Sequence, residues 1–173
     1  MIKQIIISIL LLLPISTTNV GTKTIQAIPS RDHFVVYNQI FKNNPKLEHT
    51  YVYRLSDAIV KASIKHGLNP KKFSAILAQE CRYRLNCINK ATKDYGIGQI
   101  NQKTIKAFKM DKQRLLEDLE YSVDSAARVL ADFKRVFGRR EKNWHCRYNV
   151  GTAPFVQVSE KCGEYTTLVA RFM

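Results

Sequence analysis

A carboxylate lies on the apolar face of a helix that the sequence predicts from Asn69-Pro70 onward, an N-cap followed by a proline in the first turn. Apolar residues recur there at the spacing of an amphipathic helix, and Glu80 takes the position of the next core residue. Most helical glutamates are solvated or paired, but this position favours burial. Burial raises the pKa of a carboxyl group and lets it donate a proton near neutral pH. The i, i+3, i+4 and i+7 positions are Phe73, Ile76, Leu77 and Glu80.

The segment that follows this helix is rich in glycine and amide residues. Residues 96–101, Gly-Ile-Gly-Gln-Ile-Asn, bring a backbone with few bulky side chains towards the carboxylate, together with the amides of Gln99 and Asn101. Asp94 and the glycines predict a loop over residues 90–101. Two interpretations of the amides are open. They bind a polar ligand, or they bridge backbone groups of the loop, with Asn101 capping the next helix.

Helical periodicity dominates the rest of the chain. The clearest case covers residues 119–137, where apolar residues form one face and Gly138 follows at the expected stop. No alternating strand pattern, internal repeat or long linker is present in the sequence. We therefore expect a mainly α, compact domain over residues 51–173 with little or no β structure, and an N-terminal extension of unknown role over residues 28–50. The other expected helices cover residues 51–65, 104–110, 141–149 and 163–172.

The composition limits the partners of the chain. A length of 173 residues with 45% hydrophobic residues suits one domain. The 28 Lys and Arg residues exceed the 14 Asp and Glu residues and give a formal charge of +14, which favours an anionic partner such as nucleic acid, a membrane surface or a bacterial cell wall. No long Lys/Arg run or nucleic-acid-binding motif is present, so we expect no nucleic-acid partner. No zinc-ligand spacing is present either, and we expect no metal or other cofactor.

The N-terminus is typical of a secretory signal peptide. One Lys precedes a largely apolar run over residues 5–13, which is too short to span a bilayer. An N-terminal core helix or strand is the alternative, and the polar stretch that follows argues against it. We expect the signal to cover residues 1–18, or to extend to residue 27, and the mature protein to reach the periplasm or cell surface of a bacterium. No Cys follows closely, so no lipid anchor is expected.

Four cysteines lie in the part of the chain that would be exported. An even number in an oxidising compartment predicts two disulfides, and the sequence alone permits three connectivities. The local pairs are favoured, because each joins residues close in the sequence. They are Cys81 with Cys87 and Cys146 with Cys162.

Three short motifs resemble, in the same order, those of the lytic transglycosylases with a goose-type lysozyme fold, the SLT domain family. Residues 80–83 resemble the family's Glu-Ser-x-Phe motif, residues 96–101 its Gly-Leu-Met-Gln-Ile-Asn motif, and residues 148–151 its Tyr-Asn-x-Gly motif. Residues 165–172 are similar to its last helix. Each motif is short, but three in order are specific. The resemblance covers about residues 55–172, and the chain looks most like the small members associated with secretion systems, conjugation and phage entry.

The resemblance implies a mechanism with one carboxyl group. Glu80 would protonate the bond between N-acetylmuramic acid and N-acetylglucosamine, and would then take a proton from the muramic C6 hydroxyl as a 1,6-anhydro ring closes. Tyr148 would orient Glu80 through a hydrogen bond; an ordinary core tyrosine is the alternative. The implied substrate-binding side chains are Tyr83, Gln99, Asn101 and Asn149.

The sequence departs from the family pattern at three positions. Cys81 replaces the usual Ser, Arg84 replaces an Asn, and Gly98 replaces the Met that contacts sugar in the family. A disulfide at Cys81 would fix the end of the catalytic helix.

Other functions are also open. If Asp94 faced Glu80 across a cleft, it could activate water, and the enzyme would be a hydrolase. A non-catalytic wall-binding assembly component is a second alternative, which Glu80 argues against. A membrane-active toxin is disfavoured, because no long cationic amphipathic stretch is present. The expected partners are peptidoglycan glycan strands and a secretion or conjugation apparatus, with the chain acting as a monomer.

Overall fold

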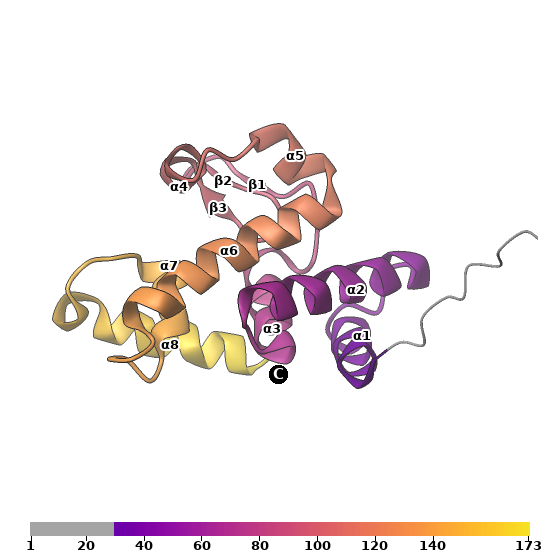
Figure 1. Cartoon of the computed structure of the whole chain (residues 1–173), viewed down its shortest axis with the longest axis horizontal. Coiled ribbons are helices and arrows are strands. Elements are labelled where there is room, and N and C mark those ends of the chain that lie inside the picture. Colours follow the sequence, from indigo (N-terminus) through magenta and orange to yellow (C-terminus); the bar gives the residue numbers. More distant parts are fainter. Residues whose placement is uncertain (1–29) are drawn as a thin grey trace, which may run out of the picture.

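Residues 30–173 are described by the computed structural model shown in Figure 1, and the fold is mainly α, as predicted. The expected signal peptide, over residues 1–18 or 1–27, lies outside the described residues. No helix within residues 30–173 combines the length and the apolar character needed to cross a membrane. The helices are α1 (Arg31–Asn43), α2 (His49–His66), α3 (Pro70–Cys81), α4 (Gln102–Ala107), α5 (Lys112–Glu117), α6 (Leu119–Phe137), the 3₁₀ helix η1 (Trp144–Cys146), α7 (Arg147–Val150) and α8 (Phe155–Ala170).

Helix α3 forms where the sequence predicts it and carries Glu80 in its last turn. The Asn69 side chain accepts a hydrogen bond of 2.9 Å from a backbone N–H of the first turn, and Pro70 occupies a position where no N–H is needed. The helix ends after Cys81, because Arg82 adopts a left-handed conformation with φ 51°. All the residues from 73 to 78 are buried, so α3 is a core helix that brings Glu80 to the edge of the core.

Helix α6 crosses the middle of the molecule in Figure 1, with α4, α5 and the strands on one side and α2 and α3 on the other. Its bounds are those predicted, and its apolar face is buried against its neighbours. Gly138 follows the helix with a right-handed φ of −61°, so its role as a stop does not depend on a left-handed turn. The buried apolar residues of α6 are Leu119, Val123, Ala126, Ala127, Val129 and Leu130.

Two strands of a small antiparallel sheet lie within residues 90–101, which were predicted to be a loop, and the third strand directly precedes them. The strands are β1 (Ile88–Asn89), β2 (Asp94–Tyr95) and β3 (Ile100–Asn101), in the order β1-β2-β3. In the register, Tyr95 pairs with both Ile88 and Ile100, and Asp94 pairs with Asn89 and Asn101. Strands of two residues are too short to show the alternation that identifies a strand, which is why the sequence indicated only a loop.

Helix α1 packs against α2 and α3, although residues 28–50 are predicted only as an extension of unknown role. Val36 and Ile40 are fully buried in the same core as the rest of the fold. The Gln39 side chain donates hydrogen bonds to the backbone oxygens of Lys71 at 3.0 Å and Phe172 at 2.6 Å. From residue 31 onward the extension therefore shares the core of the helical domain and contacts its C-terminus.

The C-terminal helix begins earlier than predicted. Helix α8 starts at Phe155 and passes through Gly163, whereas the sequence predicts a helix that begins at Gly163. A glycine inside a helix is unfavourable by about 1 kcal/mol relative to alanine. Gly163 is therefore expected at the end of a helix rather than in its interior. The helix expected over residues 141–149 is a 3₁₀ turn followed by the short α7, and α5 was not predicted.

Two disulfides are present within the described residues, and they are the two local pairs favoured by the sequence. Cys81–Cys87 links the end of α3 to the residue before β1. Cys146–Cys162 links η1 to α8.

Candidate active site

A cleft of ≈ 390 Å³ opens beside the end of α3, and most of the residues singled out in the sequence line it. Its walls come from the small sheet, α4, α6 and the segment that contains α7. Most of the lining side chains are polar, and Val129 and Phe133 of α6 provide apolar surface. The lining residues are Glu80, Thr92, Asp94, Gln99, Ile100, Asn101, Thr104, Val129, Phe133, Tyr148, Asn149 and Gly151.

Glu80 is half-buried at this cleft, and its carboxylate accepts a hydrogen bond of 2.6 Å from the Tyr165 hydroxyl. Burial raises the pKa of Glu80 from 4.5 to about 7; the Tyr165 hydrogen bond opposes the rise and the charge of Asp94 adds to it. A carboxyl group with a pKa near 7 can both donate and accept a proton at neutral pH. The geometry therefore suits a residue that acts as acid and then as base.

Tyr165 is a hydrogen-bond partner of Glu80 that the sequence does not predict. Residues 165–172 resemble a family helix, but the resemblance assigns the bond to the carboxylate to Tyr148. Burial raises the pKa of Tyr165 well above 10, and the adjacent Glu80 charge adds to the rise, so the phenol stays protonated and donates. Its place on a buried helix face with Val169 signals a phenol in need of a partner, but nothing in the sequence identifies that partner.

Tyr148 lines the cleft, but its hydroxyl does not form the hydrogen bond to Glu80 that the resemblance implies. Its hydroxyl donates to the backbone oxygen of Gly98 at 2.7 Å. A Cβ added at Gly98 would lie 2.6 Å from that hydroxyl and 2.5 Å from the Cβ of Ala126. The absence of a side chain at position 98 therefore lets Tyr148 and α6 approach the loop. Tyr148 braces the loop, and its expected hydrogen bond to Glu80 is made by Tyr165.

The two loop amides line the cleft and also hold the loop together. The Gln99 amide donates to the backbone oxygens of Cys87 at 3.2 Å and Gly96 at 3.0 Å. The Asn101 side chain caps α4 by accepting a bond of 3.0 Å from the Lys103 N–H. Its amide nitrogen also donates to Asp94 at 2.7 Å. Both amides therefore bridge groups of the loop, as one of the two interpretations predicts. They also line the cleft, where a ligand can contact them.

Asp94 and Asn149 both line the cleft, but Asp94 is bonded to other residues of the loop whereas Asn149 is exposed. The Asp94 carboxylate is held inside the loop by hydrogen bonds from Asn101 and from the hydroxyl of Thr92. Its charge reaches Glu80 and raises the pKa of that group. Asn149 is exposed at the cleft, where its amide is open to a ligand.

The expectation that Tyr83 contacts substrate is wrong, because its side chain is completely buried. Its hydroxyl lies 3.3 Å from the Ser74 hydroxyl and 3.5 Å from the Asn43 amide nitrogen, and it does not line the cleft. Positive φ angles at both Arg82 and Tyr83 reverse the chain after α3 and accompany this inward placement. Tyr83 anchors the end of α3 in the core.

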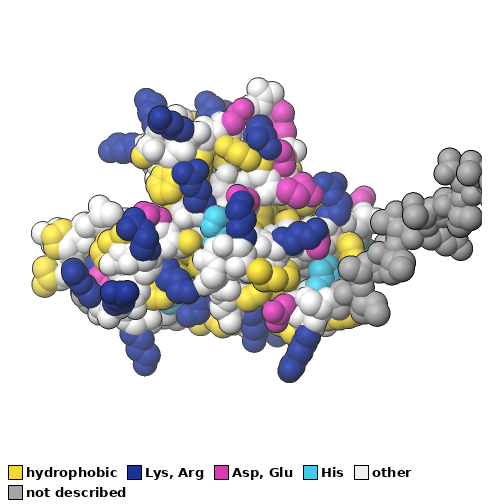
Figure 2. Space-filling model, viewed as in Figure 1, with side chains coloured by type: hydrophobic (Ala, Val, Ile, Leu, Met, Phe, Trp, Pro, Cys, Tyr) yellow, Lys and Arg dark blue, Asp and Glu magenta, His cyan; other side chains and the backbone are white. Residues whose placement is uncertain are grey.

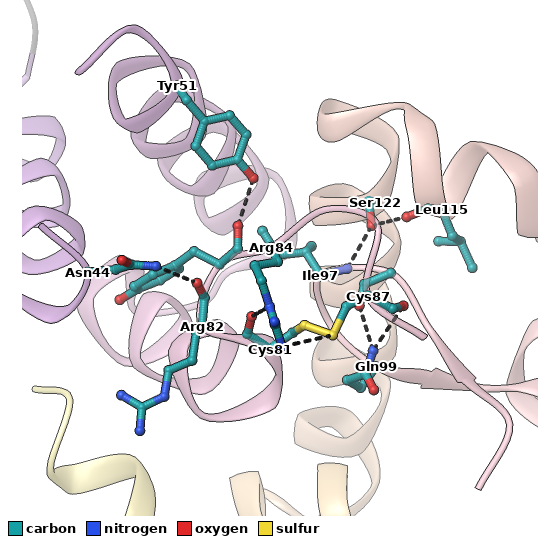
Figure 3. Close-up of a disulfide and its surroundings, with 12 residues drawn as sticks. Asn44, Tyr51, Cys81, Arg82, Arg84, Cys87, Ile97, Gln99, Leu115 and Ser122 are labelled. Atoms are coloured by element: carbon teal, nitrogen blue, oxygen red, sulfur yellow. Dashed lines mark hydrogen bonds between the residues drawn. A yellow bond between two sulfur atoms is a disulfide. The ribbon is translucent and has the colours of Figure 1, made fainter. Parts of the chain in front are cut away.

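The disulfides connect the elements that carry the cleft residues. Figure 3 shows Cys81 joined to Cys87, whose backbone oxygen accepts a hydrogen bond from the Gln99 amide. Cys81 directly follows Glu80 in the sequence, and the same Cys87 oxygen accepts from the Gly96 N–H at 2.9 Å. The second bridge starts two residues before Tyr148 and ends three residues before Tyr165. The first bridge therefore links the end of α3 to the residue that holds the Gln99 amide. The second links the segment of Tyr148 to the helix that carries Tyr165. Within residues 30–173, no three His, Cys, Asp or Glu side chains gather closely enough to hold a metal ion.

Comparison with known proteins agrees with this geometry. Residues 57–167 match the Transglycosylase SLT domain. The chain belongs to this family. Protein IpgF of Shigella sonnei and Protein IpgF of Shigella flexneri are each 30% identical to it over 107 residues, which cover 57% of this chain and 68% of each relative.

Membership of the SLT family defines the class of enzyme. SLT proteins are lytic transglycosylases that act on peptidoglycan, and this chain is one of them. The match spans the structural elements from α2 to α8 and includes the whole cleft.

Proposed function

We propose that this SLT protein is exported and that it cleaves the β-1,4 bond between N-acetylmuramic acid and N-acetylglucosamine with Glu80 as its single acid and base. The observation that carries the proposal is the half-buried carboxyl group of Glu80, with a pKa of about 7, at the cleft. At or below neutral pH a large fraction of this group is protonated. It can therefore give a proton to the glycosidic oxygen as the C1–O4 bond breaks through an oxocarbenium-like transition state.

The ionised Glu80 then takes the proton from the C6 hydroxyl of the muramic residue, and the C6 oxygen bonds to C1. The proton lost in the first step is regained in the second, the products carry a 1,6-anhydro end and a free 4-hydroxyl, and no water is consumed. Tyr165 keeps the carboxylate oriented through its 2.6 Å hydrogen bond in both steps. The Asp94 charge favours the protonated form before the first step.

The remaining cleft residues supply contacts for the sugars. Asn149 is exposed and offers an amide donor and acceptor, and Gln99 and Asn101 present amide groups along the loop wall. Tyr148 shapes the wall through its bond to Gly98. Val129 and Phe133 provide the apolar surface against which a sugar ring can pack. Because Gly98 has no side chain, the contact that Met makes in the family is absent.

The basic surface suits an anionic wall. Figure 2 shows Lys and Arg side chains spread over much of the drawn face, where they outnumber Asp and Glu, in keeping with the formal charge of +14. Such a surface attracts polyanionic wall polymers at low ionic strength, and the attraction weakens as salt rises. Local wall opening by one small catalytic domain, beside a secretion or conjugation apparatus, is the biological role that we propose.

The products distinguish this proposal from its alternatives. We expect purified protein to release muropeptides with 1,6-anhydromuramic ends from isolated peptidoglycan, as judged by mass spectrometry. Reducing muramic ends would instead mean that water attacks C1, with Asp94 as the candidate base. Binding to the wall without release would show a non-catalytic role. A reaction with the Glu80→Gln variant provides the matched control.

Export is tested on the intact chain. Expressed from its first Met in a Gram-negative host, the protein is expected in the periplasmic fraction with a new N-terminus after residue 18 or as late as residue 27. N-terminal sequencing of that fraction gives the cleavage site. Recovery only from the cytoplasm with an intact Met1 would contradict the proposed export.

A further inference from the structure

The chain leaves α3 through a strained turn directly after Glu80. Arg82 and Tyr83 both have positive φ angles, 51° and 66°. Residues with a Cβ avoid this left-handed region, which glycine enters without steric penalty. Two such residues in succession persist only where surrounding groups hold them. Because Glu80 lies two residues before this turn, any relaxation of the turn moves the end of α3 and its carboxylate.

Side-chain donors from outside α3 hold the two strained residues. The Asn44 amide donates to the backbone oxygen of Arg82 at 3.1 Å, and the Tyr51 hydroxyl donates to the backbone oxygen of Tyr83 at 2.7 Å. The preceding carbonyl, that of Cys81, accepts from the Arg84 N–H at 3.1 Å. Three consecutive carbonyls after Glu80 are thus bonded. Figure 3 shows Asn44 and Tyr51 on one side of this segment and the disulfide on the other.

Both donors come from the N-terminal layer of the fold. Asn44 directly follows α1, and Tyr51 lies in the first turn of α2. Tyr51 is half-buried, and burial raises its pKa to about 12, so it remains a donor at any pH at which the protein works. The buried residues of α1 and the contact between Gln39 and Phe172 fix this layer against the C-terminus. Asn44 and Tyr51 therefore belong to a layer that is packed against the rest of the fold.

We propose that Tyr51 and Asn44 are positioning residues for Glu80, holding the left-handed turn at residues 82–83 so that the end of α3 presents the carboxylate to Tyr165 and the cleft. Through Cys81–Cys87 the same restraint reaches the Cys87 carbonyl, which holds the Gln99 amide. This assigns a role to residues just after α1, which lie before the segment matched by the family. The inference rests on the proposed function of Glu80.

Tyr51→Phe removes one hydroxyl and keeps the ring. We expect kcat on isolated peptidoglycan strands to fall by about tenfold with little change in KM, because substrate contacts are intact and the acid is misplaced. Water reaching a loosened Glu80 moves its pKa towards 4.5, so the loss of activity at high pH begins at a lower pH. The groups that face Glu80, Tyr165, Tyr148 and Asp94, are unchanged in this variant.

Tyr121→Phe is the matched control, because it also removes a tyrosine hydroxyl bonded to the backbone. The Tyr121 hydroxyl accepts from the Asp111 N–H at 2.8 Å, and both residues are distant from α3 in the sequence. This control should leave kcat and the pH profile unchanged. Asn44→Ala should repeat the effect of Tyr51→Phe and serves if that variant does not fold. Asn tolerates the left-handed region better than Arg. Arg82→Asn should therefore restore most of the activity lost in either variant.

The outcomes separate the inference from the function on which it rests. If wild type releases anhydro products while Tyr51→Phe and Asn44→Ala both match Tyr121→Phe in kcat and pH profile, Tyr51 and Asn44 do not position Glu80. A lower melting temperature with an unchanged pH profile would show a purely structural role and would also overturn the inference. If wild type itself releases no product, the proposed function fails first.

Discussion

Glu80→Gln should abolish the release of anhydromuropeptides. The loss in kcat should be at least about 10²-fold and up to about 10⁴-fold, the range contributed by a positioned general acid and base. Gln keeps the shape of the side chain and an oxygen that accepts from the Tyr165 hydroxyl, so the cleft should remain intact. Binding of the variant to peptidoglycan, measured by co-sedimentation, should equal that of wild type. Activity within tenfold of wild type would remove Glu80 from the mechanism.

The same substitution should stabilise the fold above neutral pH. The pKa of Glu80 is about 7 in the folded protein and 4.5 in its ordinary range, so between these values the folded state binds more protons than the unfolded state. The contribution of this group to stability is therefore present below pH 4.5 and is lost as pH rises through about 7. Gln has no charge to bury. At pH 8 the variant should gain on the order of 2 kcal/mol, a value reduced from the full shift because Glu80 is partly exposed.

Urea unfolding at pH 5 and pH 8 measures this difference. The gain should be clear at pH 8 and much smaller at pH 5, where most of Glu80 is already protonated in the folded state. The exposed Glu160 on α8 provides a control, since Glu160→Gln should change stability little at either pH. Equal stability of wild type and Glu80→Gln at pH 8 would show that burial of the carboxylate is not costly.

Local signals made helices α3 and α6 predictable. Asn69 and Pro70 mark the start of α3, and the apolar spacing through Leu77 identifies its buried face, on which Glu80 stands out. Helix α6 has a long apolar face, and both disulfides join residues close in sequence. In each case the information lies within about twenty residues, over which periodicity and capping act.

The partners within the cleft could not be predicted from such signals. Tyr165 and Glu80 meet across 85 positions, and the Tyr148 hydroxyl instead bonds the backbone oxygen of Gly98, where an added Cβ would lie 2.6 Å from that hydroxyl. Tyr83 was misplaced because its direction is set by two left-handed residues, which have no signature when neither is glycine. These features arise from tertiary packing, which overrides the local pattern.

Glu141→Ala should destabilise the fold substantially. Arg147 is 1% exposed, and its guanidinium forms two bonds to the Glu141 carboxylate, at 2.8 and 2.7 Å. It also donates to the backbone oxygens of Gly151 at 3.1 Å and Ala153 at 2.6 Å. Removing the carboxylate breaks this buried ion pair, and the loss of one member of such a pair typically costs about 3–5 kcal/mol. Asp57→Ala, which breaks an exposed pair with Lys61, should cost no more than about 1 kcal/mol.

The position of this pair links its stability to the cleft. Arg147 directly precedes Tyr148 and Asn149, and the carbonyls that it holds belong to the segment whose Gly151 lines the cleft. The nearby disulfide Cys146–Cys162 keeps the segment attached to α8 when the pair is broken. Glu141→Ala should therefore lower the melting temperature and increase hydrogen exchange over residues 141–153, while the exchange of α3 changes less. A free energy of unfolding as close to wild type as that of Asp57→Ala would show that the buried pair contributes nothing net, and that the cleft wall is held by the disulfide and by the Tyr148 bond to Gly98.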